Sequence, residues 1–229
     1  MISRTRKIVD SLLLIMSVII ALFVGYCYSC VSGSKDCNVL IEGTKNATGF
    51  LGEYTSYFMG SGVVVSKDGY VLTAGHCVRD TQKLRVTLRN GKSYEISEYF
   101  VPEDPNFDFG IIKLPADVND FKPLGNSDLA VGWIYNIGNA KGIWEDSFFF
   151  GTVYNSHFKR MVFGKSEYIL AKITIWPGCS GGGVYKYKEL VGVVSMKPDE
   201  DGCLIVPTNV IKTLWGSCKS HKVGEQLNR

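Results

Sequence analysis

The sequence is short of the features on which several classes of protein depend. It contains 7 prolines and 3 histidines in 229 residues, and it has no internal repeat, no low-complexity segment and no basic tract. Without a basic tract or an aromatic-basic stripe, a net charge of +3 gives little support to nucleic-acid binding. The 25 glycines and the 45% hydrophobic share indicate a globular, turn-rich protein and exclude a disordered or fibrous chain.

Cysteine and histidine are too scattered to form a metal site. Of the 7 cysteines, Cys27 and Cys30 border an apolar run near the N-terminus. The other five include no Cys-x-x-Cys pair, and none lies at zinc-ligand spacing from a histidine, so we expect no metal and no cofactor. In an oxidising compartment some of the five would pair, and their odd number leaves at least one thiol over.

Charge is absent from a long stretch near the N-terminus. No charged residue occurs over residues 11–34, and residues 12–26 are its apolar centre. With its flanks included, this stretch fits a membrane-spanning helix, and a cleaved signal peptide is the alternative. Arg4, Arg6 and Lys7 precede it, and positive flanks stay cytoplasmic. We therefore expect a single-pass anchor with the rest of the chain on the extracytoplasmic side, or secretion after cleavage.

From about residue 49 onward, short apolar runs alternate with turn signals. The segment SGVVVSKDGYVLTAGHCV predicts two strands around a turn at residues 67–69, and KLRVTLRNGKSYEISEYF predicts two around Asn90-Gly91. Five further runs predict strands: FDFGIIKLP, AVGWIYNIGNA, SFFFGTVYNS, EYILAKITI and ELVGVVSMK. Near the C-terminus, Thr208 is expected to cap a short helix with an apolar face. Such regular strand spacing favours barrels or a sandwich.

The domain boundaries follow from this pattern. Residues 1–34 are expected to be the membrane anchor or signal segment and residues 35–48 a linker. Residues 49–218 form the predicted globular domain, and residues 219–229 a polar, frayed tail.

One short segment carries two candidate nucleophiles. The segment PGCSGGGVY places Cys179 beside Ser180, ahead of three glycines. An activated nucleophile needs a base, and the base needs an orienting carboxylate. His76 ends a predicted strand in LTAGHCV, and Asp108 heads an apolar strand in NFDFGIIKL. Neighbouring side chains on an extended backbone point in different directions, so only one of the two nucleophiles faces His76.

The three segments resemble those of a known family. TAGHC, DFGIIKL and GCSGG are similar to the triad motifs of chymotrypsin-fold serine proteases, in the order His, Asp, Ser. The bacterial HtrA/Deg type is the most similar, because LIVPTNVIKTL also resembles the strand and helix that close its protease domain. The resemblance covers roughly residues 49–215. It implies an all-β domain of two six-stranded β-barrels with a short C-terminal helix, here preceded by a transmembrane helix. We expect no PDZ domain after Trp215.

The resemblance also implies a role for each residue of the triad. The nucleophile of this family immediately precedes the glycine pair, so Ser180 is expected to attack the substrate and Cys179 is not. His76 would transfer the proton, and Asp108 would orient the imidazole. The backbone amides of Gly178 and Ser180, with Cys179 as a third candidate, would stabilise the oxyanion.

Substrate contacts are implied in the same way. Ser195 matches a serine that lies near the triad aspartate and the substrate backbone. Thr174 would lie at the base of the primary specificity pocket, with Met196 and Lys197 along its wall. Without a carboxylate at the base, small or medium apolar residues are expected before the scissile bond of protein or peptide substrates.

Two departures from the family concern cysteines. Cys179 stands where trypsin-like enzymes carry an aspartate that pairs with a freed N-terminus, so activation by N-terminal insertion is not expected. Cys77 follows the histidine as in digestive proteases, but its usual partner would fall near Gly60 or Ser61, which leaves Cys77 a free core thiol. Cys179 and Cys203 are expected to form either a disulfide or two buried thiols.

The predicted function is a serine endopeptidase that acts through an acyl-enzyme. A catalytically silent chymotrypsin-fold binding or adaptor protein, tethered to a membrane, is the alternative, and loss of a triad residue would favour it. No triad residue is lost. An α/β-hydrolase esterase would need the order Ser, Asp, His, which this sequence does not have. The oligomeric state remains open.

Overall fold

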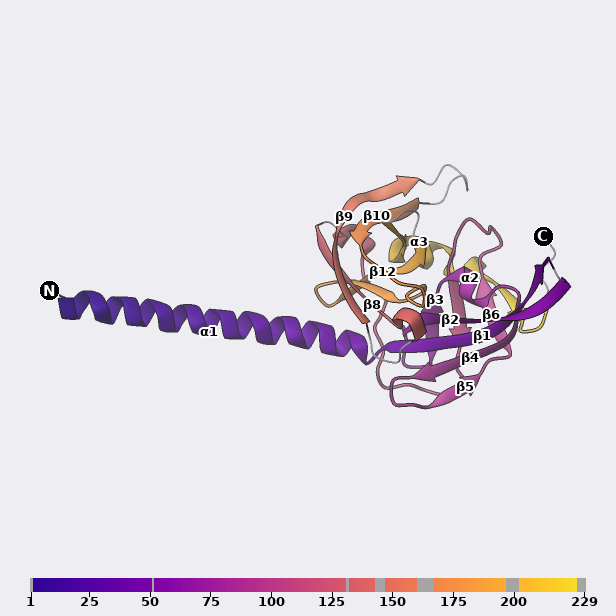
Figure 1. Ribbon diagram of the computed structural model, residues 1–229, viewed down its shortest axis with the longest axis horizontal. Coiled ribbons are helices and arrows are strands. Elements are labelled where there is room, and N and C mark those ends of the chain that lie inside the picture. The colour runs from indigo at the N-terminus through magenta and orange to yellow at the C-terminus, as the bar shows by residue number, and fades with distance from the viewer. Residues whose placement is uncertain are drawn as a thin grey trace.

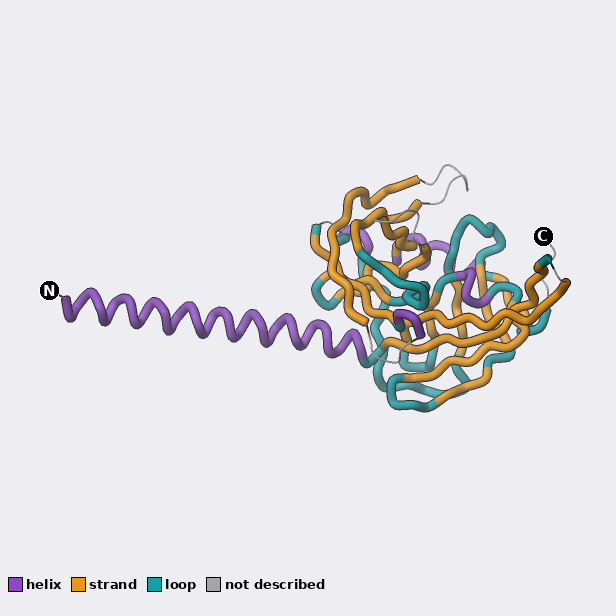
Figure 2. The backbone as a smooth tube through the Cα atoms, viewed as in Figure 1, coloured by secondary structure: helices purple, strands orange, loops and turns teal. Residues whose placement is uncertain are grey.

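The computed structural model describes residues 2–50, 52–130, 132–142, 147–159, 167–196 and 202–225. Two β-structured halves pack against each other, and one long helix leaves them on one side (Figure 1). This helix, α1, spans Ile2–Lys35. Its segment Ser11–Lys35 contains an 18-residue window with a mean hydropathy of 2.3 and is long and apolar enough to cross a membrane. Figure 2 shows that strands make up most of both halves, whereas the other helices are short.

The first half is an eight-stranded sheet in the order β14-β6-β7-β3-β2-β1-β4-β5. Its interior is filled by buried aliphatic side chains such as Ile41, Val71 and Leu84. The fold class is the predicted one, but this half has eight strands in place of the six expected. The strands are β1 (Asn38–Gly49), β2 (Gly52–Val64), β3 (Tyr70–Thr73), β4 (Thr81–Leu88), β5 (Ser93–Glu95), β6 (Glu98–Val101), β7 (Gly110–Lys113) and β14 (Lys219–Lys222).

The hairpins predicted from turn residues are confirmed. β2 pairs antiparallel with β3 across the turn at residues 67–69, and β4 pairs with β5 across Asn90-Gly91. Gly69 and Gly91 both have a positive φ, which is the backbone conformation that these turns require. A single helical turn, α2 (Gly75–Val78), follows β3 directly.

Two segments predicted to lie outside the domain are part of its sheet. The expected linker over residues 35–48 is wrong, because β1 lies between β2 and β4. The expected frayed tail is wrong over Lys219–Lys222, which pairs with β6 as β14. β14 consists of polar residues, and main-chain hydrogen bonds hold it in place. A charged edge strand of this kind is common because it discourages pairing with other chains.

The second half, referred to as the second barrel, is a closed barrel of six strands, as predicted, in the order β10-β13-β12-β11-β8-β9. Its interior includes Ile134, Val194 and Ile205. The strands are β8 (Trp133–Gly138), β9 (Ser147–Lys159), β10 (Glu167–Ile173), β11 (Gly183–Lys186), β12 (Glu189–Met196) and β13 (Gly202–Pro207).

The predicted C-terminal helix is present as α3 (Thr208–Leu214), but its expected cap is wrong. Pro207 takes the N-cap position, and the Thr208 side chain makes no capping bond. The buried Thr208 hydroxyl contacts the carbonyl oxygens of Gly125 and Val191 at 3.0 and 3.2 Å. It therefore fastens the helix to the barrel.

Candidate active site

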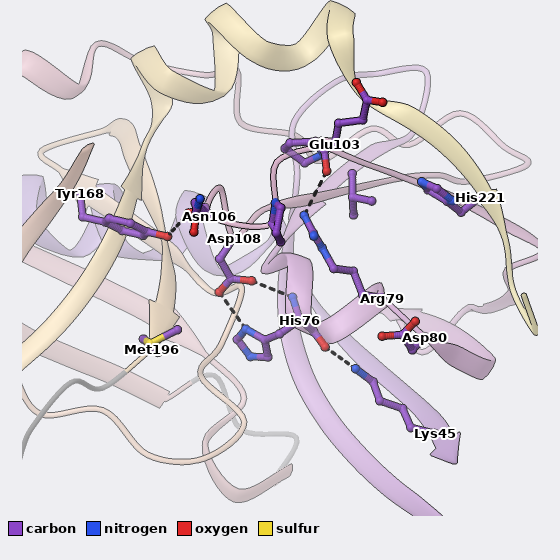
Figure 3. Close-up of a pocket in the computed structure, with 13 residues that line it drawn as sticks. Lys45, His76, Arg79, Asp80, Glu103, Asn106, Asp108, Tyr168, Met196 and His221 are labelled. Atoms are coloured by element: carbon purple, nitrogen blue, oxygen red, sulfur yellow. Dashed lines mark hydrogen bonds and ion pairs between the residues drawn. The ribbon is translucent and has the colours of Figure 1, made fainter. Parts of the chain in front are cut away.

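The two predicted triad residues His76 and Asp108 are in direct contact (Figure 3). His76 lies in α2, and its Nδ1 is 2.8 Å from Asp108 Oδ2. The backbone N–H of His76 donates to Asp108 Oδ1 at 2.7 Å, and the Ser195 hydroxyl donates to Oδ2 at 2.6 Å. The His76 side chain is 46% exposed and that of Asp108 only 11%. A largely buried carboxylate thus fixes one face of an accessible imidazole.

The loop that ends at Asp108 is held from both halves of the molecule. The Arg79 guanidinium donates to the Phe107 carbonyl at 3.3 Å. From β10 of the second barrel, the Tyr168 hydroxyl donates to the Asn106 carbonyl at 2.6 Å. The position of the carboxylate therefore depends on how the two halves are packed together.

The hydrogen bonds decide the charge state of this pair. Burial raises the pKa of Asp108, but the hydrogen bonds from His76, the charge of His76 and the hydrogen bond from Ser195 together lower it by more, so the pKa lies below its ordinary value. Burial lowers the pKa of His76, but Asp108 and the neighbouring Cys77 thiol raise it by more, so the pKa lies above its ordinary value. Asp108 therefore stays ionised and stabilises an imidazolium at His76.

The residues before the predicted nucleophile form a type II turn. The Cys179 N–H donates to the Trp176 carbonyl at 3.0 Å, and Gly178 has a φ of +96°. Such a turn favours proline and then glycine in its two central positions, which are Pro177 and Gly178 here. The Pro177 carbonyl accepts a hydrogen bond from the Lys141 N–H at 2.5 Å. Because a trans peptide directs its C=O and N–H to opposite sides, the Gly178 N–H points away from Lys141.

This turn leaves two of the three expected oxyanion donors available. The N–H groups of Gly178 and Ser180 have no hydrogen-bond partner among the residues that the structure describes. The Cys179 N–H donates to the Trp176 carbonyl and closes the turn, so it is not available to an oxyanion. The expectation that Cys179 contributes to the oxyanion hole is therefore wrong, because the turn that frees its neighbours uses its own amide.

The structure separates the two candidate nucleophiles. Cys179 is fully buried among the aliphatic side chains of the second barrel, and burial raises the pKa of its thiol. Ser180 is partly exposed. No hydrogen bond joins the Ser180 hydroxyl to His76, although the Ser180 carbonyl lies 3.8 Å from the thiol of Cys77, the residue after that histidine.

Ser61 in β2 braces the nucleophile loop, a role that the sequence reasoning missed. The buried Ser61 hydroxyl donates to the Gly178 carbonyl at 2.6 Å, and its backbone N–H donates to the Ser180 carbonyl at 2.8 Å. The same hydroxyl accepts from the Asn139 N–H at 2.7 Å. A serine just before the apolar run GVVV carries no recognisable signal, because its partners are more than 75 residues away in the chain.

Lys45 in β1 is a second site residue that sequence reasoning missed. Its ammonium donates to the His76 carbonyl at 2.5 Å. It also lines a pocket of about 920 Å³ that opens beside His76 and Asp108 (Figure 3). Lys45 had been expected to belong to a linker, which no motif connected with the histidine.

The predicted specificity residues are only partly brought together. Met196, at the end of β12, lines the pocket beside His76. Thr174 is exposed after the end of β10 and does not line that pocket. Lys197 lies outside the described residues. The expected specificity pocket therefore stays a prediction.

The six cysteines whose side chains are described are free thiols. Of the two alternatives for Cys179 and Cys203, the structure has two buried thiols and no disulfide. Cys77 is buried and free, as expected, and its Sγ lies against Gly60, the position named for its usual partner. Within the described residues, no group of three or more His, Cys, Asp or Glu side chains is placed to hold a metal ion.

Comparison with known proteins identifies the family of this chain. A family model described as a trypsin-like peptidase domain matches residues 60–193. A probable periplasmic serine endoprotease DegP-like of Chlamydia trachomatis is 43% identical over 86 residues, which are 37% of this chain and 17% of that protein. Its counterpart in Buchnera aphidicola is 32% identical over 184 residues, 72% of this chain and 39% of that protein. The serine endoprotease DegS of Haemophilus influenzae is 36% identical over 90 residues, 36% of this chain and 26% of that protein. The chain thus spans less than half the length of these relatives.

Solved structures share the fold. The HtrA-type protease AlgW with a decapeptide has a TM-score of 0.69 at 20% identity, over 82% of this chain and 66% of that chain. The same protease with a tripeptide has a TM-score of 0.68 at 22% identity, over 82% of this chain and 62% of that chain. At these identities the likeness concerns the fold alone, and the family model supplies the assignment. The chain belongs to the family of trypsin-like peptidase domains, with the chymotrypsin-type fold of HtrA proteases.

Proposed function

We propose that this protein is a serine endopeptidase whose triad is His76, Asp108 and Ser180. The observation that carries the proposal is the Asp108 carboxylate, which accepts hydrogen bonds from the His76 ring, the His76 amide and the Ser195 hydroxyl. We infer that neutral His76 keeps its proton on Nδ1, beside the aspartate, so that Nε2 can act as the base. The relatives named as serine endoproteases and the fold shared with AlgW support the same activity.

In the proposed reaction, the Ser180 Oγ attacks the carbonyl carbon of the scissile peptide bond. His76 takes the hydroxyl proton and returns it to the leaving amine, which gives an acyl-enzyme. A water molecule, deprotonated by His76, then attacks the ester carbonyl, and His76 returns that proton to the Ser180 Oγ as the acid product leaves. A Ser180–His76 hydrogen bond is not a requirement of the free enzyme, because catalytic hydrogen bonds often shorten only when substrate binds.

The oxyanion of each tetrahedral intermediate would accept hydrogen bonds from the N–H groups of Gly178 and Ser180. Two observations support this role: both groups lack a partner among the described residues, and the Pro177 carbonyl is fixed on the opposite side of its peptide plane. Donors that are held in place before the reaction stabilise the developing charge without reorganisation.

Active-site labelling of the full-length protein tests the nucleophile. A fluorophosphonate probe should label the wild type and fail with Ser180→Ala, whose turnover should fall by on the order of 10⁴ to 10⁶. The matched control is Cys179→Ala, which should keep its labelling because this thiol is buried in the barrel. If thiol alkylation abolished activity while Ser180→Ala remained active, the assignment would be lost. A wild type that binds peptides without being labelled would support the non-catalytic binding protein.

We further propose that α1 anchors the protein in a membrane, with the β-structured halves on the extracytoplasmic side. The support is the apolar segment Ser11–Lys35 preceded by Arg4, Arg6 and Lys7. Fractionation with protease protection tests this topology. Digestion of the catalytic domain only from the cytoplasmic side would overturn the orientation, and a soluble product without its first thirty or so residues would indicate a cleaved signal peptide.

For substrates, we propose proteins or peptides with a small or medium apolar residue before the scissile bond. The solved relatives hold a decapeptide or a tripeptide, which supports peptide-like ligands. The side chain implied for the pocket base is that of Thr174, which is uncharged. A peptide-library cleavage profile dominated by Arg or Lys at that position would refute the preference.

A further inference from the structure

The C-terminal end of α1 is joined to the second barrel. The Ser34 hydroxyl lies 3.3 Å from that of Tyr135 in β8, and Lys188 Nζ lies 3.4 Å from Ser29 Oγ. The same ammonium lies 5.5 Å from the centre of the Tyr26 ring. These contacts fix the direction of the helix with respect to the barrel.

The turn between β11 and β12 therefore lies beside the last turns of α1. A helix crosses the hydrocarbon core with about 20 residues, so a span that begins at Ser11 leaves the core near residue 30. Lys188 contacts residues just before that point. If α1 spans a membrane, Tyr187 and Lys188 lie at the depth of the lipid headgroups.

A row of exposed aromatic rings begins next to this turn. Tyr135 is itself buried; its hydroxyl donates to the Tyr187 carbonyl at 2.6 Å, and its ring lies 5.4 Å from that of Phe148, the first exposed ring of the row. The row continues to Phe150 at 6.3 Å from Phe148 and to Trp133 at 5.0 Å from Phe150. Trp133 is 61% and Phe150 57% exposed. The rings stand side by side because β8 and β9 are paired antiparallel.

The exposed aromatic rings lie on the same side of the molecule as the proposed membrane anchor. β9 lies on the side of the molecule from which α1 leaves (Figure 1), and the turn between β11 and β12 contacts α1 through Lys188. A water-soluble surface rarely carries such a run of large rings without a partner. Aromatic rings are enriched where a protein meets the membrane interface, and lysines beside them attract anionic headgroups.

We propose that Trp133, Phe148 and Phe150, together with Lys186 and Lys188, form a surface that lies against the headgroup layer of the membrane. This inference rests on the proposed anchoring by α1. It adds that the catalytic domain is held on the bilayer by its second barrel in one orientation. Lipid is favoured over a second copy of the chain because the surface continues from the contact between the barrel and α1.

Tryptophan quenching by brominated phospholipid tests this contact. The full-length chain is placed in nanodiscs of phosphatidylcholine with phosphatidylglycerol, at no more than one chain per disc. Lipids brominated close to the headgroup should quench the emission, and Trp133→Phe should lose most of that quenching. The control is Trp215→Phe, which removes a half-buried ring packed against Tyr70 and should keep the quenching. Fluorophosphonate labelling in the same discs reports that each variant is folded.

The outcomes distinguish the proposals. Quenching that is equal in the wild type and in Trp133→Phe would overturn the lipid contact while leaving both the anchor and the protease activity intact. In that case, a loss of oligomer in detergent for Trp133→Ser with Phe150→Ser would show that a second copy covers the surface. A chain that does not enter the discs would overturn both the anchor and this inference. Labelling at Ser180 would still test the protease activity independently.

Discussion

The backbone N–H of Ser61 donates to the carbonyl oxygen of Ser180 at 2.8 Å, which joins the first half of the molecule to the nucleophile loop of the second. The Ser61 side chain adds a bond to Gly178, so one residue contacts both ends of the Gly-Cys-Ser segment. The proposed triad is divided between the same two halves, with His76 and Asp108 in the first and Ser180 in the second. Ser61 therefore helps to fix the position of Ser180 relative to His76 and Asp108, although it is not expected to contact substrate.

Ser61→Ala should lower kcat by about tenfold, because the Gly178 carbonyl and the Asn139 N–H lose a buried hydrogen-bond partner. KM should change less, because Ser61 is buried and does not line the pocket beside His76. Steady-state kinetics on a peptide substrate measures both constants. Ser66→Ala is the matched control, because its hydroxyl serves only the turn before Tyr70. An equal loss of kcat in the two variants would contradict the bracing role.

Activity should rise with pH as His76 loses its proton, with a midpoint above the ordinary histidine value of about 6.5. Asp108 raises the pKa of His76 by stabilising the imidazolium. Asp108→Asn removes that charge, so the midpoint should move to lower pH while the rate falls by roughly 10⁴. The rate of fluorophosphonate labelling against pH measures both effects. A midpoint that does not move in Asp108→Asn would show that the carboxylate does not set this pKa.

Gly60→Cys should form a disulfide with Cys77. A Cβ at residue 60 would lie 3.7 Å from that of Cys77, within the range of natural disulfides. The loop that it closes is short, so stabilisation of on the order of 3 kcal/mol is expected on oxidation. Mass spectrometry and chemical denaturation, with and without reductant, measure the bond and its effect. Gly60→Ser adds a side chain of similar size without sulfur, and it should show no dependence on reductant.

Thr208→Val should lower the free energy of unfolding by about 1–3 kcal/mol, because the carbonyl oxygens of Gly125 and Val191 lose a buried donor. Thr213→Val is the matched control, since its hydroxyl is exposed and contacts only the Asn209 carbonyl within the same helix. Urea denaturation measures both variants. Equal effects would mean that the buried hydroxyl does not fasten α3 to the barrel.

The parts of the fold that could be predicted are those that neighbouring residues determine. Turn residues such as Asn90-Gly91 set the hairpins, and the motifs around His76, Asp108 and Ser180 follow a chain order typical of one fold. These signals lie within a few residues of the features that they describe. They required no knowledge of how distant strands pair.

What could not be predicted depends on partners that are distant in sequence or on backbone pairing. β1 becomes a strand because β2 and β4 pair with its two edges, while its outer half is polar. β14 is polar throughout and is held by hydrogen bonds to β6. The Cys179 amide was expected in the oxyanion hole, but a turn that closes on Trp176 uses it. The local residue pattern does not predict these strands or this hydrogen bond.

Only Asp36 and Cys37 separate the end of α1 from the start of β1. The Asp36 N–H donates to the Ser32 carbonyl and the Cys37 thiol to the Gly33 carbonyl, both in the last turns of the helix. The junction between α1 and β1 is therefore short and held by hydrogen bonds. Where α1 spans a membrane, the catalytic groups would therefore stand at a constant height above the bilayer. A substrate anchored in the same membrane offers about 3.3 Å of height for each extended residue. The number of residues between the substrate's own anchor and a peptide bond would then determine whether that bond reaches the catalytic groups.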